Sequence, residues 1–254
     1  ITGFQGSFFG AQAGYNNLSG LSDVFIGFQS GFNNQTGGNN TYLGVQSGFT
    51  NVSGGNNLYL GTGAGYSSTG SNNIALGYQA ALNLTTGSNN IILGYNIDFA
   101  SSTRSNQLNI GNLIYGLNVD GSGQTVSTGN IAIGTSTPFA KFALQAAPGN
   151  TTPLFDVAST TSAGFATSSI FRIGSNGRIG IGSSTPVSTL SLTGTGGTNP
   201  LTIASSTGAT LLTILQNGNV GIGSTTPGAK LSVLADAGLP SFLSASSSGA
   251  TIFL

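Results

Sequence analysis

The sequence predicts an all-β repeat protein, in which a β-solenoid or β-roll is followed by short-strand, stalk-like repeats. Two observations carry this prediction. A bulky apolar residue followed by glycine recurs about every 17 residues through the first half of the chain, and a longer repeat takes over near residue 118. A strict period is typical of architectures that stack one unit on the next. We therefore predict about seven 17-residue repeats in residues 1–117, and repeats of about 41–48 residues in residues 118–254.

The apolar residue of each pair ends a short β-favouring segment, such as Thr41-Tyr42-Leu43. A unit this short cannot bury an apolar face of its own. Stacking such units about 4.8 Å apart would pair each backbone with the next and place like side chains over one another. We predict that the apolar residues of the pairs form one internal ladder, which consists of Phe9, Ile26, Leu43, Leu60, Leu76, Leu93 and Ile110.

Other residues recur at fixed distances from the glycine of each pair, here called the anchor glycine. Glycine and asparagine accept left-handed backbone at corners, and glycine also lets neighbouring backbones approach closely. The aromatic residues among them are predicted to form a second ladder in the core or between chains. The alternative is a surface on which carbohydrate stacks. The glutamine and asparagine positions predict turns and stacked amides, with ligand recognition as the alternative. These positions are Tyr15, Phe32, Phe49 and Tyr66; Gln12, Gln29, Gln46 and Gln79; and asparagine pairs such as Asn39-Asn40.

Four Asn-X-Ser/Thr triplets are candidate glycosylation sites, and we expect them to share one position of the repeat. If the producing cell modifies such triplets, one edge of the stacked repeats would carry a row of sugars. The alternative, which we favour, is that asparagine, serine and threonine are simply common in turns. The four candidates are Asn17, Asn34, Asn51 and Asn83.

The second half of the chain repeats a Gly-X-Ile/Val-Ala/Gly-Ile-Gly block that ends in Thr-Pro. The blocks span residues 129–138, 177–186 and 218–227. Asn176-Gly177 and Asn217-Gly218 lie between alternating apolar segments, which predicts hairpins within a small meander of strands. Gly180 and Gly221 indicate close approach of another backbone, and such small-residue faces suit several chains wound together. The chain begins at Ile1 and ends at Leu254 inside repeats, so we expect a longer protein around it.

The composition argues against several classes of function. The chain has no His, Cys, Met or Trp, and its five acidic residues are scattered aspartates. General acids and bases, thiols and soft metal ligands are thus nearly missing, and we expect no enzyme activity, no catalytic residue, no cofactor and no metal. A net charge of zero with 4% charged residues argues against nucleic-acid binding. No apolar run approaches the length of a spanning helix, so we expect no membrane insertion of this segment.

Two groups of segments resemble known fibre repeats. Residues 39–49 and 72–81 resemble the head repeats of trimeric autotransporter adhesins, which build a left-handed parallel β-roll from three chains. Residues 130–138 and 219–233 are similar to phage-type tail-fibre stalk repeats. Proteins with that stalk pattern often end in a self-cleaving intramolecular chaperone, which is not among these residues, so no catalytic residue carries over. The resemblance implies an intertwined parallel homotrimer that forms a fibre.

These expectations favour a structural subunit of an extracellular or cell-surface microbial fibre or filament, with or without an adhesive role. The alternative is a bacteriophage tail fibre on a virion that takes part in host receptor binding. The expected partners are two further copies of the chain, an end-to-end filament, and a host-surface glycan or protein in the adhesive case. A monomeric solenoid is the rival to the trimer. An ice- or glycan-binding solenoid is disfavoured because Thr36, Thr41, Thr62 and Thr69 do not keep register.

Overall fold

The structure is a computed structural model that describes residues 5–160, 167–194, 197–234, 244–245 and 251–252. Over these residues the chain is all-β, with no helix, which confirms the all-β part of the predicted fold class. Ile1 and Leu254, where the chain is expected to begin and end inside repeats, lie outside the described residues. The chain divides into two compact units, residues 1–147 and residues 148–254.

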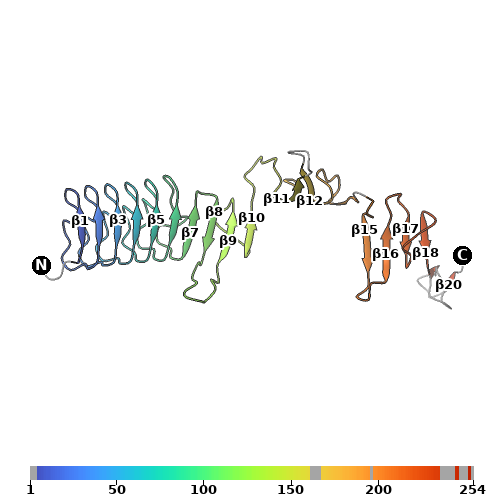
Figure 1. Ribbon diagram of the computed structural model, residues 1–254, viewed down its shortest axis with the longest axis horizontal. Helices are drawn as coiled ribbons and strands as arrows, with labels where there is room; N and C mark the ends of the chain where they lie inside the picture. Colours follow the sequence, from blue (N-terminus) through green and yellow to red (C-terminus); the bar gives the residue numbers. More distant parts are fainter. Residues whose placement is uncertain (1–4, 161–166, 195–196, 235–243, 246–250, 253–254) are drawn as a thin grey trace. The chain divides into compact units, whose positions relative to one another are not determined.

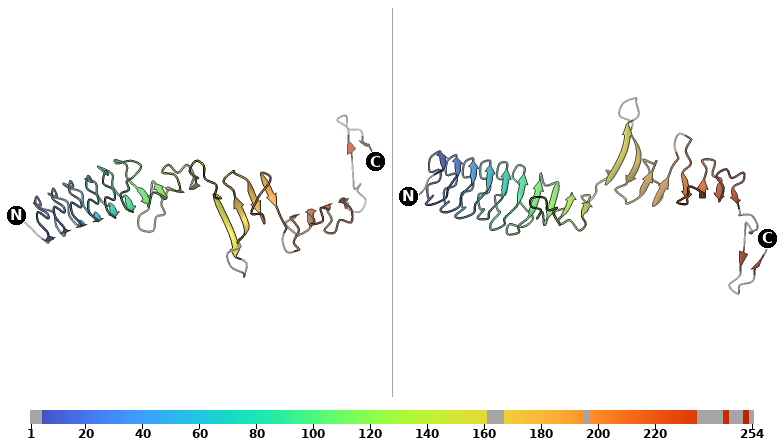
Figure 2. Two further views of the ribbon diagram at one scale, coloured as in Figure 1. Left: turned by 90° about the horizontal axis from the view of Figure 1, so that it is seen from above. Right: turned by 60° about the horizontal axis from the view of Figure 1, so that its bottom comes forward.

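The first unit is built on one ten-stranded sheet in which the strands follow chain order (Figures 1 and 2). β1 to β7 pair in parallel, and each residue of a strand lies beside its counterpart one repeat later, as Leu43 lies beside Leu60. β8 then pairs antiparallel with both β7 and β9, and β10 pairs in parallel with β9. The strands are β1 (Ser7–Phe9), β2 (Val24–Ile26), β3 (Thr41–Leu43), β4 (Leu58–Leu60), β5 (Ile74–Leu76), β6 (Ile91–Leu93), β7 (Gln107–Ile110), β8 (Ile114–Leu117), β9 (Asn130–Ile133) and β10 (Phe142–Leu144).

The change of repeat type does not coincide with the division between the units. The predicted boundary after residue 117 falls between β8 and β9, inside one continuous sheet. The units divide later, after Ala147. The first Gly-X-Ile block therefore extends the sheet of the stacked repeats.

Each repeat from β1 to β7 is one coil of the chain, and successive coils are bonded outside the strands as well. For example, the Gly31 N–H donates to Ser47 O and the Gln46 N–H donates to Phe28 O, both at 2.9 Å. Left-handed backbone turns the corners, with φ near +60° at Asn39 and Gln46. This is the role predicted for the asparagine and glutamine positions.

The interior of the coils is filled by the middle residue of each strand, and this corrects the predicted internal ladder. Phe25, Tyr42, Tyr59 and Ile92 are fully buried, whereas Phe9 and Leu60, from the predicted ladder, are 77% and 43% exposed. The residues of the predicted ladder do lie in register, but on the outer face. The reason is that successive side chains of a strand point to opposite faces. Because the middle and the last residue of a strand are both apolar, the sequence pattern alone does not say which of them points inward.

The middle residue of each strand shares the interior with the residue seven positions after the anchor glycine, and the two are complementary in size and hydrogen bonding. The Tyr59 hydroxyl donates to Ser68 Oγ at 2.7 Å, and Asn51 Nδ2 donates to the Tyr42 hydroxyl. Where the middle residue is the small Ala75, both it and Leu84 are buried. The coil thus keeps its interior filled by exchanging a ring and a polar partner for alanine and leucine.

The Tyr59–Ser68 pair can be tested by a double-mutant cycle. Burial raises the pKa of Tyr59 to about 12, so its hydroxyl is a donor at neutral pH. We expect Tyr59→Phe to lower the free energy of unfolding by about 1–2 kcal/mol, because the Ser68 hydroxyl is left buried without its partner. Tyr59→Phe combined with Ser68→Ala should cost clearly less than the sum of the two single changes. Additive losses in urea unfolding would contradict a buried bond.

A second buried ladder is made of amides that bind the next coil. The side-chain oxygens of Asn40 and Asn57 accept the backbone N–H of Asn57 and Asn73, each at 2.9 Å. Asp23 begins this ladder and accepts the Asn40 N–H at 2.8 Å. Its second oxygen accepts Asn17 Nδ2 and Asn34 Nδ2. Burial raises the pKa of the Asp23 carboxyl above its ordinary value, although the hydrogen bonds from Asn40, Asn17 and Asn34 oppose the shift.

Asp23→Asn is therefore expected to stabilise the coils in a pH-dependent way. The folded-state pKa of Asp23 is raised. The contribution of its carboxyl to the free energy of unfolding is therefore greatest below the unfolded pKa of about 3.9 and is lost as pH rises through the folded pKa. The variant should melt above the parent at pH 7, and this advantage should shrink toward pH 3. The next coil shows that asparagine fits, since Asn40 Nδ2 and Asn51 Nδ2 both donate to Gly54 O. An advantage that does not change with pH would contradict the role of the charge.

The second unit contains two four-stranded sheets of the same topology. In each sheet the first three strands are antiparallel and the fourth is parallel to the third. The hairpins predicted at Asn176-Gly177 and Asn217-Gly218 are confirmed. The strands are β11 (Phe155–Thr160), β12 (Thr167–Ile173), β13 (Ile179–Ile181) and β14 (Leu190–Leu192), then β15 (Leu201–Ala204), β16 (Thr210–Ile214), β17 (Val220–Ile222) and β18 (Leu231–Val233); β19 (Ser244–Ala245) and β20 (Thr251–Ile252) form a separate pair.

The predicted meander is wrong for the last strand of each sheet. The segments that end in Thr-Pro cross over the sheet instead of forming a hairpin, so β14 and β18 arrive parallel. Gly180 and Gly221 make room for this crossing, because a Cβ there would lie 2.4 Å from Ser183 O and 2.5 Å from Ser224 O. The close backbone approach predicted at these two glycines is confirmed, and it is made by the same chain.

Candidate functional site

The most extensive surface feature of the first unit is an apolar outer sheet face. It consists of two columns that run along the sheet, formed by the residues that flank the inward residue of each strand. One column has a large apolar residue on all ten strands: Phe9, Ile26, Leu43, Leu60, Leu76, Leu93, Ile110, Ile114, Ile133 and Leu144. The column continues without interruption where the strand pairing changes from parallel to antiparallel. The other column is Ser7, Val24, Thr41, Leu58, Ile74, Ile91, Leu108, Gly116, Ile131 and Phe142.

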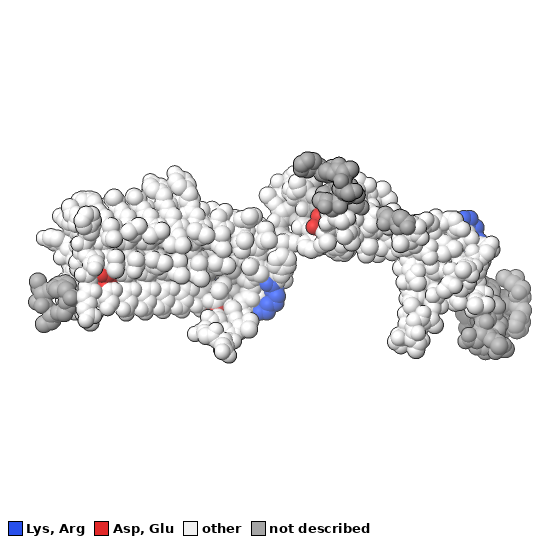
Figure 3. Space-filling view, viewed as in Figure 1, with Lys and Arg blue, Asp and Glu red and all other residues white. Residues whose placement is uncertain are grey.

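Ten strands at about 4.8 Å spacing make this face about 43 Å long, and two columns with their side chains are about 10 Å wide. The resulting strip of about 400 Å² is as large as the largest apolar patches on monomeric proteins, which are often functional. Neither column contains a charged residue. Figure 3 shows that charged side chains are few and far apart on the side in view. We call this strip and its equivalents in the second unit the apolar sheet face.

Each four-stranded sheet of the second unit repeats the arrangement. One side carries eight apolar residues in two registered rows, and the other carries polar or small residues such as Thr213 and Gly221. Ile181, Leu190, Ile222 and Leu231 are about half exposed on the apolar side. The rows are Phe155–Ile173–Ile179–Leu190 and Val157–Phe171–Ile181–Leu192, then Leu201–Ile214–Val220–Leu231 and Ile203–Leu212–Ile222–Val233.

The predicted aromatic ladder lies at the surface of the coils. Tyr15, Phe32, Phe49 and Tyr66 stack with centroid separations of 5.0–5.3 Å and nearly parallel planes. Each inner ring is therefore covered on both faces by its neighbours, and only ring edges reach solvent. A sugar that stacks on an aromatic ring needs the open face, so this geometry argues against the carbohydrate-stacking alternative along the ladder.

The glutamine ladder is bonded to itself. Gln29 Nε2 donates to Gln12 Oε1 at 2.8 Å, and Gln46 Nε2 donates to Gln29 Oε1 at 3.0 Å. The amides that would recognise a ligand are thus engaged in holding adjacent coils together. This favours the stacking role predicted for these positions.

Three of the four candidate glycosylation sites point into the coils. Asn17, Asn34 and Asn51 are buried, and Asn51 Nδ2, which would bear the sugar, donates to Gly54 O at 2.7 Å. Asn83 is exposed and lies one position earlier in its repeat, because Leu84 takes the buried position. A row of sugars at one shared position is therefore wrong for the folded chain, and the turn interpretation fits the three buried residues.

Features that would indicate other kinds of site are few. Among the described residues, no three His, Cys, Asp or Glu side chains gather in a way that could hold a metal ion.

No protein-family model, curated protein or solved structure matches the chain. In the part of the chain that the structure describes, no helix is long and apolar enough to cross a membrane. The apolar sheet face is therefore the main candidate for a functional surface. Such a face is suited to association with another apolar surface.

Proposed function

We propose that this chain is a structural subunit of an extracellular microbial fibre, in which residues 5–117 form a β-solenoid and three parallel copies associate through the apolar sheet face. The observation that carries the proposal is the recurrence of such a face in both units, each taken by itself. Large apolar residues occupy one outer column on all ten strands of the first unit and two rows of each four-stranded sheet in the second.

The four-stranded sheets support the proposal most directly. A sheet with one apolar and one polar side is stable when another layer covers the apolar side. Within the described residues, Leu190 and Leu231 on that side remain 53% and 58% exposed. Three copies that turn these sides toward a common axis would bury them and leave the polar sides in water. The gain is about 25 cal/mol for each Å² of apolar surface removed from solvent.

Composition and chemistry agree with a scaffold. The chain is neutral and has no sulfur-containing residue, so the common oxidative lesions have no target. The ladders hold adjacent coils together without disulfides. A phage tail fibre, the alternative function, would assemble in the same way and would differ in what the fibre is attached to.

The proposal is tested by the mass of the purified segment in solution. We expect light scattering coupled to size-exclusion chromatography to give three times the 25.2 kDa of one chain. A stable monomer at micromolar concentration would overturn the trimer. Imaging of the native assembly on a cell surface or on a virion distinguishes the fibre from the tail fibre.

A further inference from the structure

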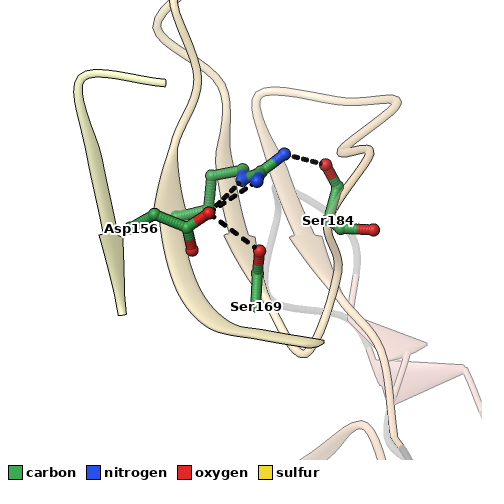
Figure 4. Close-up of polar contacts among 4 residues, drawn as sticks. Asp156, Ser169 and Ser184 are labelled. Atoms are coloured by element: carbon green, nitrogen blue, oxygen red, sulfur yellow. Dashed lines mark hydrogen bonds and ion pairs between the residues drawn. The ribbon is translucent and has the colours of Figure 1, made fainter. Parts of the chain in front are cut away.

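The first four-stranded sheet carries a charged cluster on its polar side. Arg172 donates from Nε to Asp156 Oδ2 at 3.0 Å and from Nη1 to Ser184 O, and Ser169 Oγ donates to the same carboxylate oxygen at 3.1 Å (Figure 4). The Arg172 guanidinium lowers the pKa of the Asp156 carboxyl below its ordinary value. The Asp156 carboxyl is therefore ionised at neutral pH.

A cleft of about 380 Å³ opens beside this cluster, and two of the five cationic side chains of the protein line it. Arg172 and Arg178 line it together with the hydroxyl-bearing residues Ser175, Ser184 and Thr185. Arg178 is exposed and donates from Nη1 to Pro186 O at 3.3 Å. Asp156 balances one of the two positive charges, so the cleft keeps an excess of positive charge.

The second four-stranded sheet shows that the fold does not require these charges. It has the same topology, and registered positions hold Thr202 and Thr213 where the first sheet has Asp156 and Arg172. Thr202 and Thr213 bond through their hydroxyls at 3.3 Å. Asn219 stands in the place of Arg178, and its Nδ2 donates to Pro227 O at 3.0 Å. The structural bond to the proline carbonyl is thus kept without an arginine.

We propose that the cleft between Arg172 and Arg178 binds a small ligand through a carboxylate, sulfate or phosphate group. Guanidinium groups bind such oxyanions through paired, charge-assisted hydrogen bonds. Arg172 has two N–H groups beyond those that bond Asp156 and Ser184, and Arg178 has four beyond the one that bonds Pro186. The volume lies at the lower end of the range for ligand sites, which suits a ligand the size of one acidic monosaccharide.

The site is compatible with the proposed assembly and does not depend on it. Asp156 and Arg172 occupy the middle row of their sheet, and this row faces away from the apolar rows that flank it. Association through the apolar sheet face would therefore leave the cleft open to solvent. Failure of the anion site would leave the trimer proposal standing, and the reverse also holds.

The test is a calorimetric titration of the full chain at low ionic strength with glucuronate, sulfate, phosphate and, as the uncharged control, glucose. We expect at least one anion to bind with one site per chain, to weaken as salt is added, and glucose not to bind. If glucuronate binds and the inorganic anions do not, the ligand is an acidic sugar; if all bind equally, the anionic group alone is recognised. Absence of binding by all three anions, or equal binding of glucose, would overturn the proposal.

Matched variants separate the site from general charge. Arg178→Asn reproduces the residue of the second sheet and keeps a donor for Pro186 O, so it should fold normally and weaken anion binding about tenfold or more. Arg104→Gln removes the same charge from an exposed position in the first unit and should leave binding unchanged. Equal affinities of Arg178→Asn and the parent protein, with normal melting of both, would refute the assignment.

Discussion

Replacing Gly44 with alanine is expected to destroy the stacking of the coils on either side of it. The backbone of Gly44 has φ +141°, and a Cβ there would lie 2.4 Å from Gly61 O. The clash is with backbone, so it cannot be relieved by rotating a side chain. The same contact repeats at Gly27, whose Cβ would meet Gly44 O at 2.4 Å. Relief would require the coils to separate and lose the hydrogen bonds between them.

We expect Gly44→Ala to cost at least about 4 kcal/mol in the free energy of unfolding, measured by urea denaturation with circular dichroism. Gly111→Ala is the control for a positive φ without a backbone clash. Gly111 also has positive φ, at +61°, but beyond its chain neighbours no atom lies within 4 Å of the place that a Cβ would take. The control should therefore cost only the backbone strain, about 1–2 kcal/mol. Similar losses for the two variants would show that backbone conformation, and not coil separation, makes the anchor glycines necessary.

The second large effect is expected for charges on the apolar sheet face. Leu43 and Leu60 lie side by side on adjacent strands and are 40% and 43% exposed in the single chain. Changing both to aspartate should cost one chain little, since these side chains already reach solvent. In a trimer the same change would bury six carboxylates without partners, which is strongly unfavourable. We expect the mass in solution to fall from three chains to one while the β-sheet spectrum is kept.

The control places two charges on adjacent coils away from the sheet. Val52 is 40% exposed, as Leu43 is, and Thr69 occupies a corresponding exposed position in the next coil. Val52→Asp with Thr69→Asp should leave the trimer intact. Loss of the trimer in the control and its persistence in the Leu43 and Leu60 variant would mean that the chains associate through another surface.

The sequence was sufficient for the repeat, the strands and the turns, because each depends on local chemistry. Glycine and asparagine at fixed positions predict the corners, and Asn176-Gly177 predicts its hairpin. The inner and outer faces could not be assigned in the same way, because Tyr42 and Leu43 are adjacent, both apolar, and point in opposite directions. A usable signal was present in the exchange of Tyr59 and Ser68 for Ala75 and Leu84, since compensating volumes indicate residues that fill one interior.

The charged cleft could not be predicted from the sequence. Asp156, Arg172 and Arg178 are separated along the chain and meet through one antiparallel pairing and one hairpin turn. Arg178 occupies the variable second position of the repeated Gly-X-Ile block, but Asp156 and Arg172 lie outside it, and the sequence does not place them beside Arg178. The crossover that brings Ser184 and Pro186 over the sheet is equally hidden, because a Thr-Pro segment is also typical of an ordinary turn. Comparison of the two sheets in register, which needs the structure, is what distinguishes the charged positions from the rest.

The direction of the bonds between coils has a mechanical consequence. These bonds run along the stacking axis, so tension along that axis loads them directly and one after another. A coil of about 17 residues advances the stack by only about 4.8 Å, but its released chain could extend to about 58 Å. Opening a single coil would thus add about 50 Å of length before the next yields. Such a stack would absorb a sudden pull by stepwise lengthening.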